Sequence, residues 1–168
     1  MTHTHSQVAS PETANVPARD QGALLMIASP EILKRLSALS RHAGHVATVW
    51  HGERGPPDSA ALLGNRIIFI EVQLDWTGAI EALCRFKDQS FSGLVVLVGG
   101  ENATTLEQVH TVGSGLGLRM APTLGRVYRD AQVADLLSAP TPAVVEDAVV
   151  FDVREALARD WLELWYQP

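Results

Sequence analysis

The sequence repeats one order five times: a short apolar run, then a segment with helical spacing. The clearest run is residues 66–72 (Arg-Ile-Ile-Phe-Ile-Glu-Val), whose continuous apolar character is typical of a strand buried on both faces of a parallel sheet. Because strands that alternate with helices form a parallel sheet covered on both faces, residues 21–139 should fold as one doubly wound α/β domain. Strands are predicted at residues 22–27, 45–50, 66–72, 94–98 and 119–124, and helices at 30–43, 58–63, 77–86, 104–112 and 130–138.

Local signals indicate where these helices begin and which way they face. Ser29, followed by Pro30, is expected to cap the first helix with its hydroxyl. Residues 104–107 (Thr-Thr-Leu-Glu) predict a capping box at the start of the fourth helix, and the glycines of residues 113–117 predict its end. In the third helix, helical spacing turns three side chains inward: Ile80, Leu83 and Cys84.

Composition limits the functions open to this chain. The net charge is −6 and no block is rich in Lys and Arg, which argues against nucleic acid as a partner. No apolar run approaches the roughly 18 residues of a membrane span. The single cysteine, Cys84, fits a reducing compartment, so we expect a cytoplasmic protein that binds neither nucleic acid nor membrane. Residues 1–20, rich in Thr, Ser, Pro and Ala, are predicted to be a disordered tail.

The candidate site follows from the predicted sheet, because doubly wound sheets bind ligands at the carboxyl ends of their strands. Glu71 and Asp75 are the acidic side chains expected at this edge. The residues that end or follow the predicted strands are Ala28 and Ser29 after the first, residues 71–75 at the third, Gly99 and Gly100 at the fourth, and Arg126 after the fifth.

Residues 67–74 (Ile-Ile-Phe-Ile-Glu-Val-Gln-Leu), followed by residues 78–83 (Gly-Ala-Ile-Glu-Ala-Leu), resemble the phosphoacceptor strand and the next helix of response-regulator receiver domains. The resemblance covers most of residues 21–138 and implies a flavodoxin-like, five-stranded parallel sheet with strand order 2-1-3-4-5. In that family an acidic pair after the first strand holds Mg²⁺, and an Asp on the third strand accepts the phosphoryl group. The fourth strand ends in Ser or Thr, and Lys-Pro follows the fifth.

The chain departs from this family pattern at each functional position. In place of the acidic pair, the acceptor Asp, the hydroxyl and the lysine, it has Ala28 and Ser29, Glu71, Gly99 and Arg126. Because Mg²⁺ needs several oxygen ligands, Glu71 with Asp75 nearby is a poor cage, and without the metal nothing neutralises an incoming phosphoryl group. We therefore predict no phosphotransfer, no catalytic residue, no metal and no cofactor. The domain would be a phosphate-independent interaction or dimerisation module rather than an enzyme.

Glu71 also suggests a more specific hypothesis. Its carboxylate could hold a fixed negative charge where a phosphate would lie, paired with Arg126 through a charge-assisted contact. The domain would then stay permanently in a switched state. The alternative is that Glu71 is a solvated acid at the end of a strand.

The final stretch, residues 154–168 (Arg-Glu-Ala-Leu-Ala-Arg-Asp-Trp-Leu-Glu-Leu-Trp-Tyr-Gln-Pro), resembles the opening of an EAL domain, the cyclic di-GMP phosphodiesterase or sensor module. Such domains begin with a short helix, a turn and a strand that ends in Tyr-Gln-Pro. The resemblance implies a linker over residues 140–151, the start of an EAL domain over residues 152–168, and a downstream EAL domain as a partner in the full protein. Gln167 would correspond to a residue at the cyclic di-GMP pocket of that domain.

The receiver resemblance also implies a surface for a homodimer or for a signalling protein. In that family the fourth helix, fifth strand and fifth helix form the usual dimer face. Most of the corresponding residues are expected in the core, with an exposed subset that drives dimerisation. The candidate residues are Leu106, Val109, Val127, Tyr128, Val133 and Leu137.

Two other functions are open on the sequence alone. A working phosphoacceptor receiver would show Mg²⁺-dependent modification. A flavodoxin-like ligand-binding domain or small enzyme would need a phosphate-cradling loop after a strand. Only residues 99–102 (Gly-Gly-Glu-Asn) are available for such a loop, and Glu101 would repel an anion.

Overall fold

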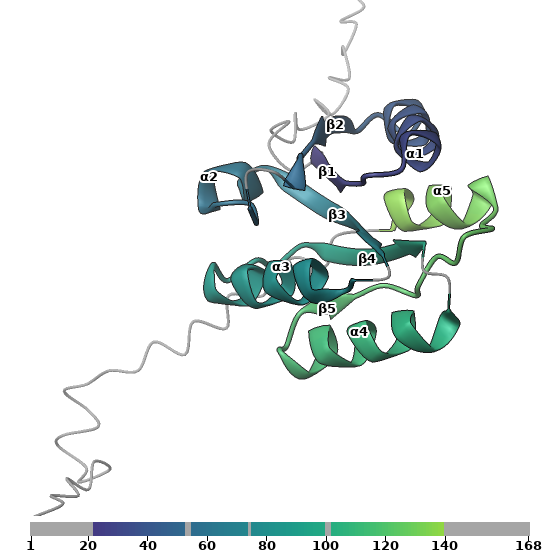
Figure 1. Ribbon diagram of the computed structural model, residues 1–168. Coiled ribbons are helices and arrows are strands. Elements are labelled where there is room, and N and C mark those ends of the chain that lie inside the picture. Colours follow the sequence, from purple (N-terminus) through teal and green to yellow (C-terminus); the bar gives the residue numbers. More distant parts are fainter. Residues whose placement is uncertain (1–21, 53–54, 74, 100–101, 140–168) are drawn as a thin grey trace, which may run out of the picture.

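The computed structural model describes residues 22–52, 55–73, 75–99 and 102–139, which form a five-stranded parallel sheet with helices on both sides (Figure 1). The order of the strands across the sheet is β2-β1-β3-β4-β5, and every neighbouring pair is parallel. The predicted doubly wound fold and its strand order are therefore confirmed. The strands are β1 (Gly22–Met26), β2 (Val46–Val49), β3 (Asn65–Val72), β4 (Leu94–Gly99) and β5 (Arg119–Met120).

Within these described ranges there are five helices, of which α1 to α4 connect successive strands and α5 follows β5. Helices α1 and α5 cover one face of the sheet, and α3 and α4 cover the other (Figure 1). The helices are α1 (Pro30–His42), α2 (Ser59–Leu62), α3 (Thr77–Asp88), α4 (Ala103–Gly115) and α5 (Asp130–Ser138).

Strand β3 shows how the sheet divides the core into two layers. Successive side chains of a strand point to opposite faces. Ile68 and Ile70 accordingly pack in the layer of α3 and α4, whereas Ile67 and Phe69 pack in the layer of α1 and α5. All four are at most 3% exposed. Glu71, two residues after Phe69, continues the row that faces α1, and this alternation sets the direction of the acid at the end of the strand.

Helix α4 begins one residue earlier than its predicted capping residue. Asn102 is the N-cap, because its Oδ1 accepts a hydrogen bond from the backbone N–H of Thr104 at 2.8 Å. Asn102 thus takes the capping role predicted for Thr104, and Ala103 becomes the first helical residue.

Strand β5 is much shorter than predicted and ends at Met120. Pro122 follows two residues later and has no N–H to donate to a neighbouring strand. Pairing with β4 resumes at a single bridge between Val98 and Leu124. The predicted strand over residues 119–124 is therefore interrupted, although the chain keeps its course along β4.

The inward orientation predicted for Cys84 is wrong, because this thiol is exposed. The buried stripe of α3 runs instead through Ala79, Ala82, Leu83 and Phe86, at the spacing of one helix face. Leu83 is fully buried as predicted.

Several predicted segments lie outside the described residues. They are the N-terminal tail of residues 1–20, the linker of residues 140–151, and the EAL-like start of residues 152–168 with Gln167. In the part of the chain that the structure does describe, no helix combines the length and the apolar character that a membrane crossing requires.

Candidate functional site

The carboxylate of Glu71 binds the loop that joins β1 to α1. Its Oε2 accepts hydrogen bonds from the backbone N–H groups of Ala28 (N···O 2.7 Å) and Ser29 (N···O 2.8 Å). Its Oε1 accepts a hydrogen bond from the Ser29 hydroxyl. Both carboxylate oxygens are therefore engaged by donors from one short loop of the chain.

The geometry of the sheet brings these groups together. Strands β1 and β3 are neighbours, with Met26 opposite Ile70, so the residues after Met26 lie beside the end of β3. Helix α1 begins at Pro30, directly after the loop. The N–H groups at the start of a helix lack partners within it and lie at the positive end of its dipole. A carboxylate aimed at this point by the alternation of β3 is therefore stabilised.

Ser29 is the N-cap residue of α1, but its hydroxyl does not cap the helix. The hydroxyl donates its hydrogen bond to Glu71 instead. The predicted cap is therefore not formed, because the Ser29 hydroxyl binds Glu71 and not the backbone of α1. Since the usual capping group is used to hold a carboxylate, the loop is organised around the side chain of Glu71.

Gly99, at the end of β4, lies next to the Glu71 side chain. Its φ angle is +87°, in the left-handed region that favours glycine. A Cβ atom built on Gly99 would lie 3.4 Å from Cγ of Glu71. A serine or threonine would be strained here, so this backbone conformation itself disfavours a hydroxyl-bearing residue.

An open depression surrounds the Glu71 carboxylate at this edge of the sheet. Ala28 takes part through its N–H group. The other five residues predicted for the pocket all line the depression: Ser29, Glu71, Asp75, Gly99 and Arg126.

Asp75 and Arg126 do not contact the Glu71 carboxylate as partners. Oδ1 of the exposed Asp75 accepts a hydrogen bond from the backbone N–H of Thr77 at 3.0 Å. Hydrogen bonds from the Thr77 side chain and backbone hold the pKa of Asp75 below its ordinary value. The predicted ion pair between Glu71 and Arg126 is not formed, since the one ion pair within 4.0 Å among the described residues lies elsewhere. The loop donors already engage both oxygens of the carboxylate.

The pocket does not fit Mg²⁺. This ion requires an octahedron of oxygen ligands anchored by carboxylates. After β1 the chain presents two N–H groups and a hydroxyl, and these donors occupy both oxygens of Glu71. Among residues 22–52, 55–73, 75–99 and 102–139, no group of three or more His, Cys, Asp or Glu side chains could hold a metal ion. The donor set suits an anion, and Glu71 supplies it.

The predicted dimer face belongs mostly to the core. Leu106, Val109, Tyr128 and Val133 are at most 4% exposed, because they face the sheet from α4, from α5 and from the loop before α5. Burial also raises the pKa of the Tyr128 hydroxyl above its ordinary value. These four side chains are therefore core residues, as expected for most of this set, and they are not available for a contact between subunits. Val127, by contrast, is 96% exposed.

Sequence reasoning missed the positive role of the loop after β1. It treated Ala28 and Ser29 as pocket positions that lack a carboxylate, and it assigned the Ser29 hydroxyl to the helix cap alone. The available signal was the Ser29–Pro30 helix start, set beside a strand whose α1-facing row ends in Glu71. Unpaired donors beside an acid on a neighbouring strand predict a hydrogen-bonded carboxylate.

No family model matches the chain, and no curated protein matches it. Solved structures do match. A response regulator from Colwellia psychrerythraea is 12% identical, with a TM-score of 0.58 over 73% of this chain and 97% of that one. The beryllofluoride-activated NtrC4 receiver domain dimer is 13% identical, with a TM-score of 0.53 over 69% and 93% of the two chains.

A third solved structure, the chemotaxis protein CheY4 of Vibrio cholerae, is 16% identical, with a TM-score of 0.50 over 69% of this chain and 94% of that one. Sequence identities this low indicate a shared fold but not a shared activity. The described domain has the fold of response-regulator receiver domains.

Proposed function

We propose that this chain carries a non-catalytic, receiver-like signalling domain that acts without phosphorylation. The observation that supports this function is the set of three hydrogen bonds that hold the Glu71 carboxylate on the loop after β1. A receiver that accepts phosphate needs carboxylates in this place to hold a cation. Here the corresponding position has hydrogen-bond donors from Ala28 and Ser29, and the Glu71 carboxylate binds to them.

Phosphoryl transfer to this pocket is disfavoured on electrostatic grounds. The incoming group is an anion, and its nearest charged neighbour would be the Glu71 carboxylate, with no metal to neutralise their repulsion. The exposed Arg126 lines the same depression, but it makes no ion pair with Glu71. We infer that the domain signals through contacts with other proteins.

The wider setting of this function rests on the resemblance of residues 154–168 to the opening of an EAL domain. We propose that the full protein belongs to bacterial cyclic di-GMP signalling and that the receiver-like domain regulates a downstream EAL domain. Regulation would proceed by homodimerisation or by docking of a protein partner. One solved structure with the same fold is described as a receiver domain dimer, which is consistent with the first route.

An amide NMR titration tests whether the pocket is silent. Mg²⁺ and then beryllofluoride, a phosphoryl mimic, are added to the isotope-labelled chain. We expect no saturable shifts at Glu71, Gly99 or Arg126, because the pocket offers no cation site and its donors are occupied. Saturable shifts centred on these residues would instead support a working phosphoacceptor receiver.

A gain-of-function variant provides the positive control for this titration. Replacing Ala28 and Glu71 together with aspartate places two carboxylates at the edge and shortens the side chain that now reaches the loop. We expect this double variant to show saturable Mg²⁺ shifts that the natural chain lacks.

The ligand-binding alternative is weakened separately, because the Asn102 side chain of the Gly-Gly-Glu-Asn segment is used to cap α4.

Dimerisation can be tested at the one exposed residue of the predicted face. Val127 is 96% exposed, so its side chain is available for a contact with a partner. We expect Val127→Lys to shift the chain from dimer to monomer in sedimentation velocity, because a buried unpaired charge opposes association. Leu63→Lys, at the end of α2 and 78% exposed, is the matched control, because it lies outside the elements of the predicted face. An unchanged dimer mass in Val127→Lys would place the interface on another surface.

A further inference from the structure

We propose that residues 143–152 of this chain dock at the base of the sheet, the edge opposite Glu71. This edge is formed by the starts of the strands, where β3 begins at Asn65, β4 at Leu94 and β5 at Arg119. The inference does not depend on the function proposed for the Glu71 pocket. It concerns the surface from which the chain leaves the domain.

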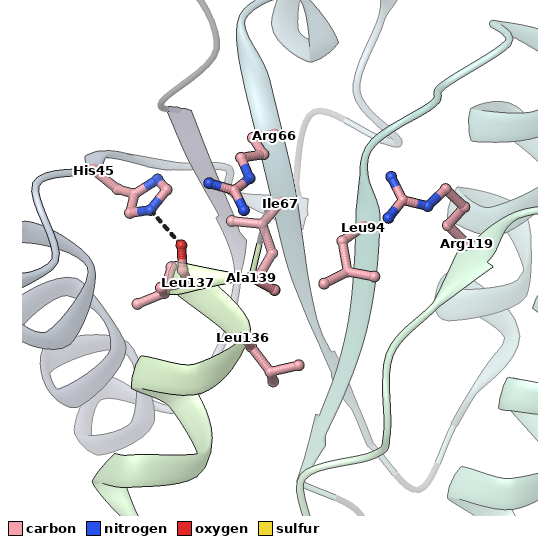
Figure 2. A pocket seen from close by; sticks show the side chains of 8 residues that line it. All are labelled: His45, Arg66, Ile67, Leu94, Arg119, Leu136, Leu137 and Ala139. Carbon is pink, nitrogen blue, oxygen red and sulfur yellow. Dashed lines mark hydrogen bonds between the residues drawn. The ribbon is translucent and has the colours of Figure 1, made fainter. Parts of the chain in front are cut away.

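A recess lies at this edge between the end of α5 and the starts of three strands (Figure 2). Its floor is apolar and includes Ile67, Leu94 and Leu136, while Arg66 and Arg119 stand at its rim. The enclosed space is about 20 Å³, which admits the tip of one side chain. Pockets for small molecules are usually ten or more times larger, at roughly 300 Å³ and above. The recess therefore suits a polypeptide that rests on its rim and inserts one side chain.

The rim carries positive charge without an acidic partner. Arg119 donates a hydrogen bond from Nη1 to the backbone oxygen of Ser92 at 3.3 Å. Across the described ranges, neither Arg66 nor Arg119 has a carboxylate within 4.0 Å. Two such guanidinium groups beside an apolar floor, in a chain with a net charge of −6, favour an acidic and apolar occupant.

The chain leaves the domain from the wall of this recess. Helix α5 ends at Ser138, and Ala139 is one of the lining residues. A hydrogen bond between Nε2 of His45 and the backbone oxygen of Leu137, 3.0 Å long, ties the end of α5 to the residue before β2 (Figure 2). The exit point is therefore fixed, and whatever follows Ala139 begins beside the recess.

Residues 143–152 combine apolar and acidic side chains, which match the apolar floor and the two arginines of the recess. Their sequence, Ala-Val-Val-Glu-Asp-Ala-Val-Val-Phe-Asp, contains seven apolar residues, three acids and no base. Glu146 follows Ala139 by seven positions, and an extended chain of that length spans roughly 23 Å. The N-terminal residues 1–20 are a poorer match, because they contain Arg19 and only scattered apolar side chains.

Paramagnetic relaxation tests this docking in the full chain. The exposed Cys84 is replaced with serine, and a nitroxide is attached through Ala148→Cys. We expect the amide signals of Arg66, Leu94 and Arg119 to lose most of their intensity, and to recover when the nitroxide is reduced. The loss should weaken as salt rises from about 0.05 M to about 1 M, because screening reduces the attraction between arginines and acids.

Charge variants identify the contact. Glu146→Lys with Asp147→Lys should restore most of the lost intensity, and this pair leaves the described domain unaltered, so misfolding cannot explain the result. Arg66→Gln with Arg119→Gln should do the same, whereas Arg85→Gln, an exposed arginine on α3, should not. Full intensity with the label at 148, or losses that the lysine pair leaves unchanged, would overturn the proposal.

Two further samples separate the other possible occupants. A label at His5→Cys that broadens the same amides, with none from position 148, would assign the recess to the N-terminal segment and refute our proposal. In the second sample, chain that carries the nitroxide but no isotope label is mixed with isotope-enriched chain that carries no nitroxide. Broadening in this mixture would reveal docking between copies. Broadening found in that mixture at the same strength as within one chain would likewise refute it.

Discussion

Replacing Glu71 with alanine should lower the free energy of unfolding by about 2 kcal/mol, the usual effect of removing a charged hydrogen-bond acceptor. The variant leaves the N–H groups of Ala28 and Ser29, and the Ser29 hydroxyl, without their acceptor. Water reaches this open edge and replaces part of the loss. Urea denaturation measures the change. Hydrogen exchange at the Ala28 and Ser29 amides should accelerate by roughly tenfold or more, since every 1.4 kcal/mol is about a factor of ten.

Two matched variants identify the cause of this loss. Glu71→Gln keeps the shape and one carbonyl oxygen for the backbone donors, and its amide can donate to the Ser29 hydroxyl, so we expect about half the loss. Glu31→Ala removes a different acid, which is exposed in the first turn of α1. It should lower the free energy of unfolding by less than about 1 kcal/mol. Equal losses in Glu71→Ala and Glu31→Ala would mean that general helix-dipole electrostatics, rather than the loop hydrogen bonds, stabilise this edge.

Phe69→Ala should lower the free energy of unfolding by about 3–5 kcal/mol, because it removes a large side chain from the core and leaves a cavity. The Phe69 ring is fully buried in the layer between the sheet and α1 and α5. A typical domain is stable by only about 5–15 kcal/mol, so the variant should unfold at much lower urea concentration. Phe69 also precedes Glu71 on the same row of β3, so the amide shifts of Ala28 and Ser29 should change in the folded fraction.

The control for this prediction is Phe69→Leu, which keeps most of the volume and should cost less than about 1.5 kcal/mol. Phe91→Ala gives a second comparison, since that ring is only half-buried and lies 5.7 Å from the Phe86 ring, centroid to centroid. It should cost clearly less than Phe69→Ala. If all three variants lost the same stability, the layer around Phe69 would not have the tight packing that the structure indicates.

The sheet could be predicted from the sequence because its central strand carries a strong local pattern. Residues 67–70 are apolar on both faces, a pattern typical of a parallel strand buried between two helical layers. The strand at residues 119–124 was less predictable. Its apolar residues suit a strand, but Pro122 and an edge position reduce the pairing to Arg119 and Met120 and one bridge at Leu124.

The site was predictable in its membership but not in its contacts. Strand ends fix which residues meet at one edge, so Ser29, Glu71, Gly99 and Arg126 were found together. The partner of Glu71 was mistaken, because a simple rule of opposite charges favours Arg126. Backbone N–H groups carry no sequence signature, and their direction depends on the course of a loop that only the structure shows. Most of the candidate dimer residues were expected in the core, and Val133 is buried there; Val127 is exposed in the loop before α5, where no helical spacing could indicate its direction.

An anion that belongs to the chain has no free concentration. The supply of phosphodonor in a cell, or the activity of a phosphatase, sets how much of an ordinary ligand site is filled, but neither can fill or empty a site whose ligand is Glu71. Occupancy is instead an internal equilibrium between the loop after β1 and the end of β3. A regulator that changed it would have to act mechanically, by drawing the loop away from the strand. Such a domain would respond to the presence of a partner and not to the metabolic state of the cell.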